Sequence, residues 1–349
     1  YEIKRLNSKI SADTKPLKFG GGRNNPNLFK VIETIKDNSR KDIAKWRQAL
    51  QMINNPEEPK FTAYHDLIDD LLTDGHLQSQ ILIRKSATLN TDFHVINRET
   101  GEVNKEITDL FRQQWFFKLL NIILDHIIFG FRLVEFQNFS DKVISLNQLP
   151  PRHLIPTQGK LIPDLSKEQF IDFNNPVFDN WLLRIGDPKS LGIINNIIPN
   201  LIWLRNALQS WAAFAEKFGM PLITATTNSR DDKTINEITE RLLELGETAA
   251  ATFGTGTDVK MLEASRQDAY NVYSKFILEN ANIVSKQLVG STILSDMGTS
   301  RSQTEVHERT LNEKISPADK REISFIVNNQ LIPLLRNQAY NIPETDIFT

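Results

Sequence analysis

Apolar positions along most of this chain recur at helical spacing, and polar, Gly- and Pro-containing stretches separate them. Leu67, Leu71 and Leu72 alternate with aspartates, which predicts one amphipathic helix over 62–83 that Gly75 can kink or interrupt. A second long helix is predicted over 107–130, ending at Gly130. Short helix and strand patterns complete this half of the chain: a helix over 42–53, and strands over 85–97, 131–136, 143–149, 153–155, 160–162 and 181–185. The pattern indicates an α+β region with small antiparallel sheets.

The second half alternates long helices with a strand-containing insert. Apolar residues at three- and four-residue spacing predict a helix from about 194 to 218, with Pro199 in its first turn, Gly219 as its cap and Pro221 as a stop. Strands over 222–226, 250–253 and 258–262 and a helix over 234–245 form the insert, in which the last two strands pair around Gly254 and Gly256. A second long helix over 268–288, a polar loop and helices over 303–316 and 317–337 follow; Ser316 is expected to cap the last one.

Composition narrows the classes of function. The net charge is −2, from 41 basic and 43 acidic residues, so the chain lacks the basic footprint of a tight, sequence-independent DNA binder. The absence of cysteine excludes disulfides, thiolate catalysis and cysteine-ligated zinc. The most apolar run, 115–131, contains Lys118, Asp125 and His126 and is too short and too charged to span a membrane. The polar stretch 1–40 is expected to be an extended arm that a neighbouring molecule orders.

The sequence shows no clustered catalytic chemistry. Gly254-Thr-Gly256 lacks the lysine and hydroxyl of a phosphate-binding loop and is interpreted as a hairpin turn. The six histidines show no paired metal-ligand spacing. Four aspartates (Asp66, Asp69, Asp70 and Asp74) form either a divalent-cation site or a solvated helix face, and their helical spacing favours the face. We therefore expect no enzyme activity, no metal site and no cofactor.

Four blocks in order carry a resemblance. They are 125–135 (DHIIFGFRLVE), 149–153 (LPPRH), 211–221 (WAAFAEKFGMP) and 283–290 (IVSKQLVG), the last followed by a Ser/Gly/Thr loop. Over roughly 60–337 the chain resembles the Mu-like branch of tailed-phage portal proteins. The resemblance implies a portal fold, with a wing, two long stem helices that bracket a small α/β clip, and a channel loop, closed into a ring usually of twelve subunits.

The resemblance also implies a division of the chain. The expected parts are an arm (1–40), wing (41–194), first stem helix (195–218), clip (219–265), second stem helix (266–290), channel loop (291–302), and return helices with a C-terminal tail (303–349). In such a ring, double-stranded DNA is packaged and ejected through the channel at a capsid vertex. Large terminase and then a head-tail connector dock on the clip, and major capsid protein meets the wing. This places the protein in the virion, after assembly in the host cytoplasm and without a membrane.

Candidate site residues follow from these parts. The DNA-channel lining is assigned to Lys275, Glu279, Lys286, Ser295, Asp296, Met297 and Arg301, and partner docking on the clip to Arg230, Asp231, Asp232, Lys233 and Glu237. In a ring each lysine becomes a belt of positive charge, which the nearby acids moderate. The alternative interpretations are a solvated helix face for the lysines and an ordinary connector for the loop.

Other classes of protein remain as alternatives. A packaging ATPase would need a phosphate-binding loop and acidic metal ligands, which the sequence lacks. A monomeric helical module, or another non-enzymatic phage structural or nucleic-acid-binding module, would leave the apolar stem helices without a partner.

Overall fold

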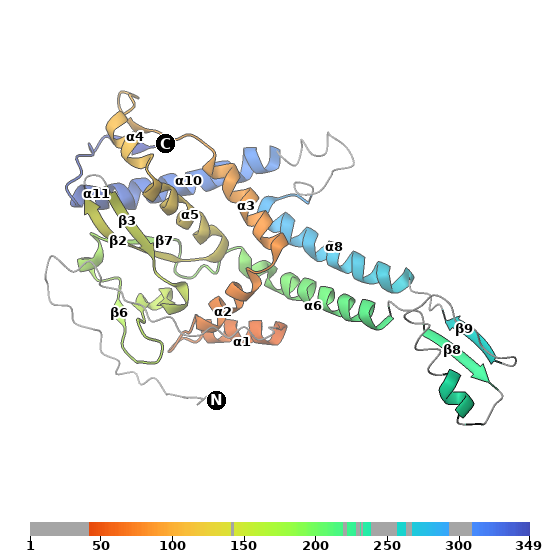
Figure 1. Cartoon of the computed structure of the whole chain (residues 1–349). Coiled ribbons are helices and arrows are strands. Elements are labelled where there is room, and N and C mark those ends of the chain that lie inside the picture. The colour runs from red at the N-terminus through yellow and green to blue at the C-terminus, as the bar shows by residue number, and fades with distance from the viewer. Residues whose placement is uncertain are drawn as a thin grey trace. The chain divides into compact units, whose positions relative to one another are not determined.

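The computed structural model describes residues 42–140, 143–218, 222–227, 231, 233–238, 257–262, 267–292 and 309–349 (Figure 1). It divides into two compact units, Tyr1–Ile202 with Asn282–Thr349, and Trp203–Ala281. The arm predicted over 1–40 lies outside the described residues. The units are described in turn.

The first unit opens with three helices, α1 (Ile43–Ile53), α2 (Thr62–Leu71) and α3 (Gly75–Leu89). The helix predicted over 62–83 is divided in two, and the interruption that Gly75 suggested is confirmed. Asp74 has extended backbone, and its carboxylate accepts a hydrogen bond from the amide of Leu77 at 2.8 Å, so it caps a new helix. The strand predicted from residue 85 is also wrong up to 89, since α3 continues there. Strand β1 covers only Val95–Asn97.

A buried helix and two small sheets form the centre of this unit. The predicted helix over 107–130 is divided into α4 (Lys105–Phe111) and α5 (Gln114–Phe129), because Gln113 is extended between them. Strands β2 (Arg132–Ser140), β3 (Val143–Gln148) and β7 (Leu182–Ile185) make an antiparallel sheet in the order β3-β2-β7. Strands β4 (Leu154–Ile155), β5 (Lys160–Leu161) and β6 (Ile171–Asp172) make another, and short 3-10 turns cover Pro151–His153, Pro156–Gln158 and Pro176–Phe178. The predicted small antiparallel sheets are confirmed.

Helix α5 lies at the core of the unit because it is apolar on nearly all sides. Its buried side chains pack with those of β2, β3 and the C-terminal helices in one cluster. The C-terminal strand β10 (Asp346–Phe348) pairs antiparallel with β1, and the Phe348 ring meets that of Phe116 at 5.6 Å. Each buried aromatic or aliphatic side chain of this kind contributes roughly 1.5–3 kcal/mol. The C-terminal strand is thus joined to the core around α5.

The C-terminal helices form one helical run over 309–337. It comprises a π-helical segment (Thr310–Ile315), α10 (Ser316–Ile326), a second π-helical segment (Val327–Leu331) and α11 (Ile332–Asn337). The predicted cap at Ser316 is wrong, because this residue is helical (φ −58, ψ −42). Pro317 and Pro333 each follow a π-helical segment. A proline ring clashes with the carbonyl four residues earlier in an α-helix, and the wider π turn displaces that carbonyl.

The second unit holds the ends of two long helices and an insert. Helix α6 (Ile194–Phe218) and α8 (Gln267–Val289) extend into it from the first unit, and the rings of Phe214 and Tyr273 meet at 6.0 Å. Strand β8 (Leu222–Thr227) pairs antiparallel with β9 (Thr257–Leu262), and residues 233–238 are helical. The segment predicted as partner of β9, 250–253, lies outside the described residues. Pro199 lies inside α6 rather than in its first turn, as α6 begins at Ile194.

Candidate functional site

The candidate site is the base of segment 293–308, in the first unit. Helix α8 ends at Val289 just before this segment, and the run from residue 309 follows it. Within the predicted channel loop 291–302, Ser291 and Thr292 are described, and Ser291 is buried. The candidate site therefore consists of the side chains around the end of α8 and the start of the run at residue 309.

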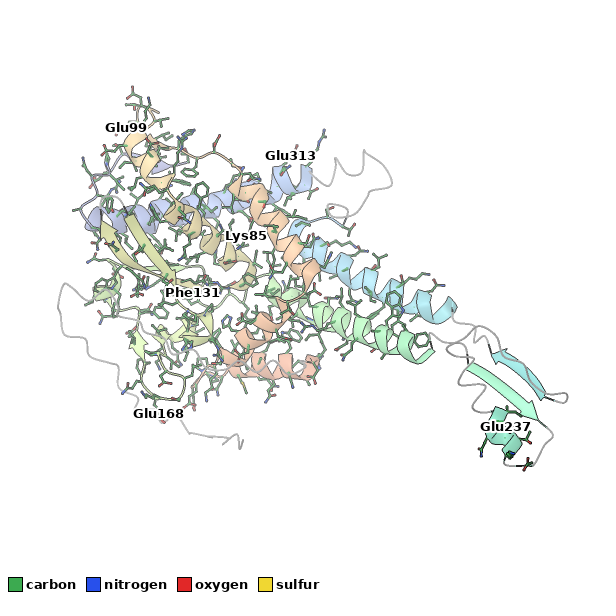
Figure 2. The ribbon with its side chains drawn as sticks, in the orientation of Figure 1. Lys85, Glu99, Phe131, Glu168, Glu237 and Glu313 are labelled. Carbon is green, nitrogen blue, oxygen red and sulfur yellow. The ribbon has the colours of Figure 1, made fainter. Side chains whose placement is uncertain are left out.

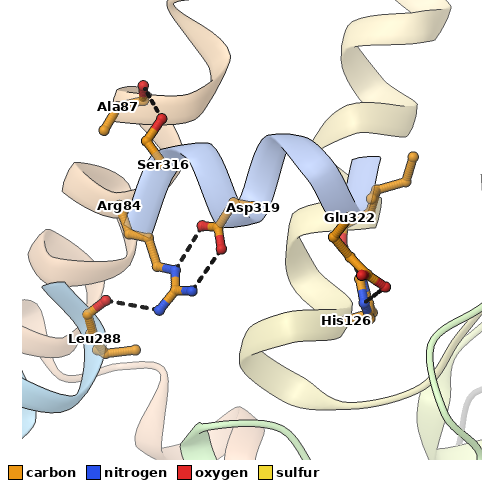
Figure 3. Close-up of polar contacts among 8 residues, drawn as sticks. Arg84, Ala87, His126, Leu288, Ser316, Asp319 and Glu322 are labelled. Atoms are coloured by element: carbon orange, nitrogen blue, oxygen red, sulfur yellow. Dashed lines mark hydrogen bonds and ion pairs between the residues drawn. The ribbon is translucent and has the colours of Figure 1, made fainter. Parts of the chain in front are cut away.

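A buried arginine joins the three helices that meet at this base (Figure 3). Arg84 of α3 donates to Asp319 of α10 from Nε (3.0 Å) and Nη2 (2.8 Å), and from Nη1 to the carbonyl oxygen of Leu288 (3.0 Å). Arg84 is 8% exposed and Asp319 3%. The Leu288 carbonyl is one of the last four of α8, which have no partner within the helix. Arg84 thus caps α8 while Asp319 neutralises its charge.

Further hydrogen bonds hold α3 against both neighbours. Nε2 of His76 lies 2.9 Å from Oγ of Ser285 near the end of α8, and the Ser316 hydroxyl donates to the carbonyl of Ala87 at 3.0 Å. Ser316, which the sequence pattern assigned to a helix cap, thus bonds across helices instead. On the other side of α10, Nε2 of His126 lies 3.4 Å from Oε1 of Glu322 (Figure 3).

Gly290 makes the turn that leaves α8. Its φ is +74°, and a Cβ there would meet the side chains of Thr310 and Ile315 at 3.1 Å. Its amide donates to the carbonyl of Lys286 at 3.1 Å. The end of α8 therefore packs closely on the π-helical segment over Thr310–Ile315.

The predicted channel residues are only partly described. Lys275, Glu279 and Lys286 are exposed, and their spacing within α8 puts them on one helix side, opposite Val284 and Leu288, which are buried. The other four predicted residues (Ser295, Asp296, Met297 and Arg301) lie outside the described residues. The structure thus shows an accessible charged side of α8 and leaves its role as a channel lining a prediction.

The predicted clip residues are also divided. The Asp231 carboxylate accepts from the hydroxyl of Thr234 at 2.9 Å and from its amide at 3.3 Å, which lowers the pKa of Asp231 and caps the helical segment 233–238. Lys233 and Glu237 are exposed. The remaining two, Arg230 and Asp232, lie outside the described residues. Asp231 therefore has a structural role whether or not it also contacts a partner.

The acidic cluster on α2 is not a solvated face. Asp66 pairs with Arg152, with Oδ1 3.1 Å from Nε and Oδ2 3.2 Å from Nη2, and Asp74 caps α3. Asp69 lines a cavity beside Arg132. Among the described residues, no group of three His, Cys, Asp or Glu side chains could hold a metal ion. The helical spacing was correct, but Asp66 and Asp69 face other elements of the fold and Asp74 caps α3.

Burial strongly shifts the pKa values of several ionisable groups, among them His65 and Glu135. Burial, and then the charges of Arg132 and Arg152, lower the pKa of His65 to about 3. Burial raises the pKa of Glu135 on β2 to about 7, opposed by a hydrogen bond with Gln137. Neither residue lies at the base of segment 293–308, so these shifts concern stability. Within the described residues, none of the helices has the length and apolarity needed to cross a membrane.

Two solved structures align with this chain over most of its length. A chain of the neck of an empty GTA particle, a structure computed with C6 symmetry, aligns with a TM-score of 0.55 and 14% identity, over 76% of this chain and 82% of that one. An HK97 family phage portal protein from Corynebacterium diphtheriae aligns with a TM-score of 0.44 and 10% identity, over 74% and 88%. A comparison with curated proteins found no match.

The family follows from the sequence itself. The family described as the portal protein of Mu bacteriophage matches residues 65–347, which is most of the chain. The chain belongs to this family of phage portal proteins. The resemblance found in the four sequence blocks is thereby confirmed, and the matched range includes all three helices joined by Arg84.

Proposed function

We propose that copies of this chain close into a ring at one capsid vertex, through which double-stranded DNA is packaged and later ejected. The observation that carries the proposal lies in the second unit. Both of its long helices expose large apolar side chains: Trp203 (45%) and Leu208 (45%) on α6, and Val272 (66%), Phe276 (45%) and Leu278 (55%) on α8. A helix on the surface of a soluble protein normally turns its large apolar side chains toward the core and its polar side chains toward water. Contiguous exposed apolar surface marks an interaction site.

In a ring, contacts between neighbouring subunits would cover these exposed apolar side chains. Head-to-tail contacts between identical subunits cover two different surfaces of each copy and close when the rotation permits. The C6 symmetry applied to the neck of the GTA particle is compatible with such an arrangement, and with the twelve subunits that the family resemblance implies. The proposed parts are those set out from the sequence, with α6 and α8 as stem helices.

The charged side of α8 is proposed to face the channel. In a ring, Lys275 and Lys286 repeat as belts of positive charge, and Glu279 between them reduces the net field. Each phosphate that a lysine neutralises adds salt-sensitive affinity. DNA can move through a channel only if the channel attracts it weakly. The net charge of −2 therefore supports a channel better than a protein that binds DNA tightly.

The anchored base gives the 291–302 segment its proposed role. Arg84, Asp319 and Gly290 fix where the segment leaves α8 and where the chain re-enters the 309–337 run. We propose that the predicted channel loop contacts DNA while this anchor keeps the neighbouring helices in place. This function needs positioning and charge, so we propose that the protein is not an enzyme.

The partners are proposed from the family. Large terminase and later a head-tail connector would dock on the clip, where Asp231, Lys233 and Glu237 are the described candidates, and major capsid protein would meet the wing. Segment 1–40 would contact a neighbouring subunit. The mature protein would reside in the virion after assembly in the host cytoplasm.

The ring is tested by mass and by electron microscopy of the purified full chain. Wild type is expected to give a closed ring, and Leu278→Asp to give monomers, because Leu278 lies beside the charged side of α8 and the introduced charge would be buried between copies. Val177→Asp is the matched control: Val177 is 65% exposed on a short 3-10 turn of the first unit, and its substitution should leave the ring intact. A wild type that stays monomeric at high concentration, without rings, would contradict the proposal.

A further inference from the structure

A cavity of about 380 Å³ lies in the first unit between α2, α3, α5 and the turn at Pro150 and Pro151. Its size falls in the range of small-molecule sites, which are roughly 300–1,000 Å³. Part of the wall is apolar, from Ile68, Leu72 and Phe129. The charged lining consists of Lys85, Arg132 and Arg152 with Asp69 and Asp125, and His65 also lines it. None of these residues belongs to the base of segment 293–308 or to the predicted channel lining.

Two other buried arginines of the unit show what an arginine here normally binds. Arg84 presents its Nε and Nη2 edge to both oxygens of Asp319, at 3.0 and 2.8 Å, and uses Nη1 for a backbone carbonyl. Arg152 pairs with Asp66 through a hydrogen bond from Nη2 to Oδ2 at 3.2 Å, and its Nε lies 3.1 Å from Oδ1 without hydrogen-bond geometry. The side-on pairing of Arg84 matches the spacing of the two oxygens of a carboxylate.

Arg132 has the same arrangement without the carboxylate. It is 5% exposed, its Nη1 donates to the carbonyl of Phe131 at 3.1 Å, and its guanidinium lies 5.4 Å from the centre of the Phe129 ring. Its Nε is buried and has no hydrogen-bond acceptor among the described residues. A buried donor left in this state costs about 1–3 kcal/mol, and more when it is charged.

The other charges of the cavity do not replace the missing partner. Lys85 points from α3 toward α5 (Figure 2), where its Nζ lies 2.7 Å from Oδ1 of Asp125. Arg152 is engaged by Asp66. Burial lowers the pKa of Arg132 to about 10, although the negative charges of Asp125 and Asp69 act to raise it. His65 is neutral near pH 7, because its pKa is about 3.

We propose that this cavity binds a carboxylate group, held by the guanidinium of Arg132, with the apolar part of the acid against Ile68, Leu72 and Phe129. The carboxylate belongs either to a free small acid or to an acidic side chain of this chain or of another copy. The site is independent of the proposed function, since neither ring closure nor DNA passage requires it. Asp69 opposes binding through its own negative charge.

The first arm of the test measures a free acid. Equilibrium dialysis of radiolabelled glutarate against the full-length wild type is expected to show saturable binding of one molecule per chain, and glutaramide, which lacks the charges, should not compete. Arg132→Gln should weaken binding at least tenfold, and Arg132→Lys should also weaken it, since an ammonium cannot pair side-on. Asp69→Asn should tighten binding several-fold. Arg184→Gln is the control, because Arg184 pairs with Asp179 at 2.8 Å and does not line the cavity.

The second arm examines the assembled protein by high-resolution cryo-electron microscopy. If an acidic side chain is the natural occupant, the map should show its carboxylate against Arg132, and wild-type glutarate binding should be absent. The proposal is overturned if wild type binds no glutarate and the map shows no carboxylate, or only Asp69, at Arg132. It is equally overturned if glutarate binds Arg132→Gln as tightly as wild type, or if Asp69→Asn binds it no better.

Discussion

Removing one partner of the Arg84–Asp319 pair tests the anchor at the base of segment 293–308. Arg84→Met leaves a carboxylate that is 3% exposed without its cation and removes the donor to Leu288. Breaking a buried pair in this way costs about 3–5 kcal/mol. Loss of the bond to the Leu288 carbonyl contributes about 1 kcal/mol of that. Asp319→Leu should lower the free energy of unfolding by a similar amount, since it leaves the guanidinium uncompensated.

The double variant makes the reasoning quantitative. Arg84→Met combined with Asp319→Leu removes both charges, so its loss should be smaller than the sum of the single losses by about 2 kcal/mol or more. Urea denaturation at one fixed protein concentration measures all three, because subunit association would otherwise shift the midpoints. Hydrogen exchange adds a local readout: the amide of Gly290, bonded to Lys286 at 3.1 Å, should exchange faster in Arg84→Met. Additive losses, with a coupling energy below about 0.5 kcal/mol, would refute the anchor.

Three further predictions concern stability and DNA. Glu135 keeps its proton in the folded state up to about pH 7, so its contribution to folding stability is intact below pH 4.5 and is lost as the pH rises through 7. In urea denaturation, Glu135→Gln should have the same free energy of unfolding as wild type at pH 4 and a value about 1–2 kcal/mol higher at pH 8, allowing for solvent screening. An equal difference at both pH values would contradict this. Gly192 has φ +73° and abuts the backbone of Ile128 and Gly130, so Gly192→Ala should cost more than about 2 kcal/mol in the same assay; a neutral result would show that the contact relaxes. Lys286→Glu in assembled rings should weaken association with double-stranded DNA and reduce its salt dependence, as measured by fluorescence anisotropy, and unchanged salt dependence would remove Lys286 from the channel.

Local sequence pattern predicted the long helices and the small sheets, because helical and alternating spacing are properties of neighbouring residues. It failed where a single side chain decides. The break between α2 and α3 depends on the Asp74 carboxylate reaching the Leu77 amide, and the π-helical segments that admit Pro317 and Pro333 have no periodic signature. Gly75 gave the one sequence hint of that break.

The anchor itself was beyond sequence reasoning. Arg84 and Asp319 are 235 positions apart, and each is an ordinary polar residue on a helix until the fold brings them together. The Gly290 block was recognised from the family resemblance, but its contact with Thr310 and Ile315 is tertiary. Arg132 and the α2 aspartates were likewise visible as residues, whereas the cavity that they share requires four segments to meet. The channel-lining and clip assignments stay predictions.

The central claim is that this member of the Mu portal family functions as a closed ring whose channel is lined by the Lys275, Glu279 and Lys286 side of α8. Electron microscopy of the purified full chain, viewed along the axis of the particles, tests it most directly. Closed rings with a central opening are expected, together with a refined map in which these three side chains face that opening. A stable monomer of 40.0 kDa without rings, or rings in which this side of α8 contacts the neighbouring subunit, would contradict it.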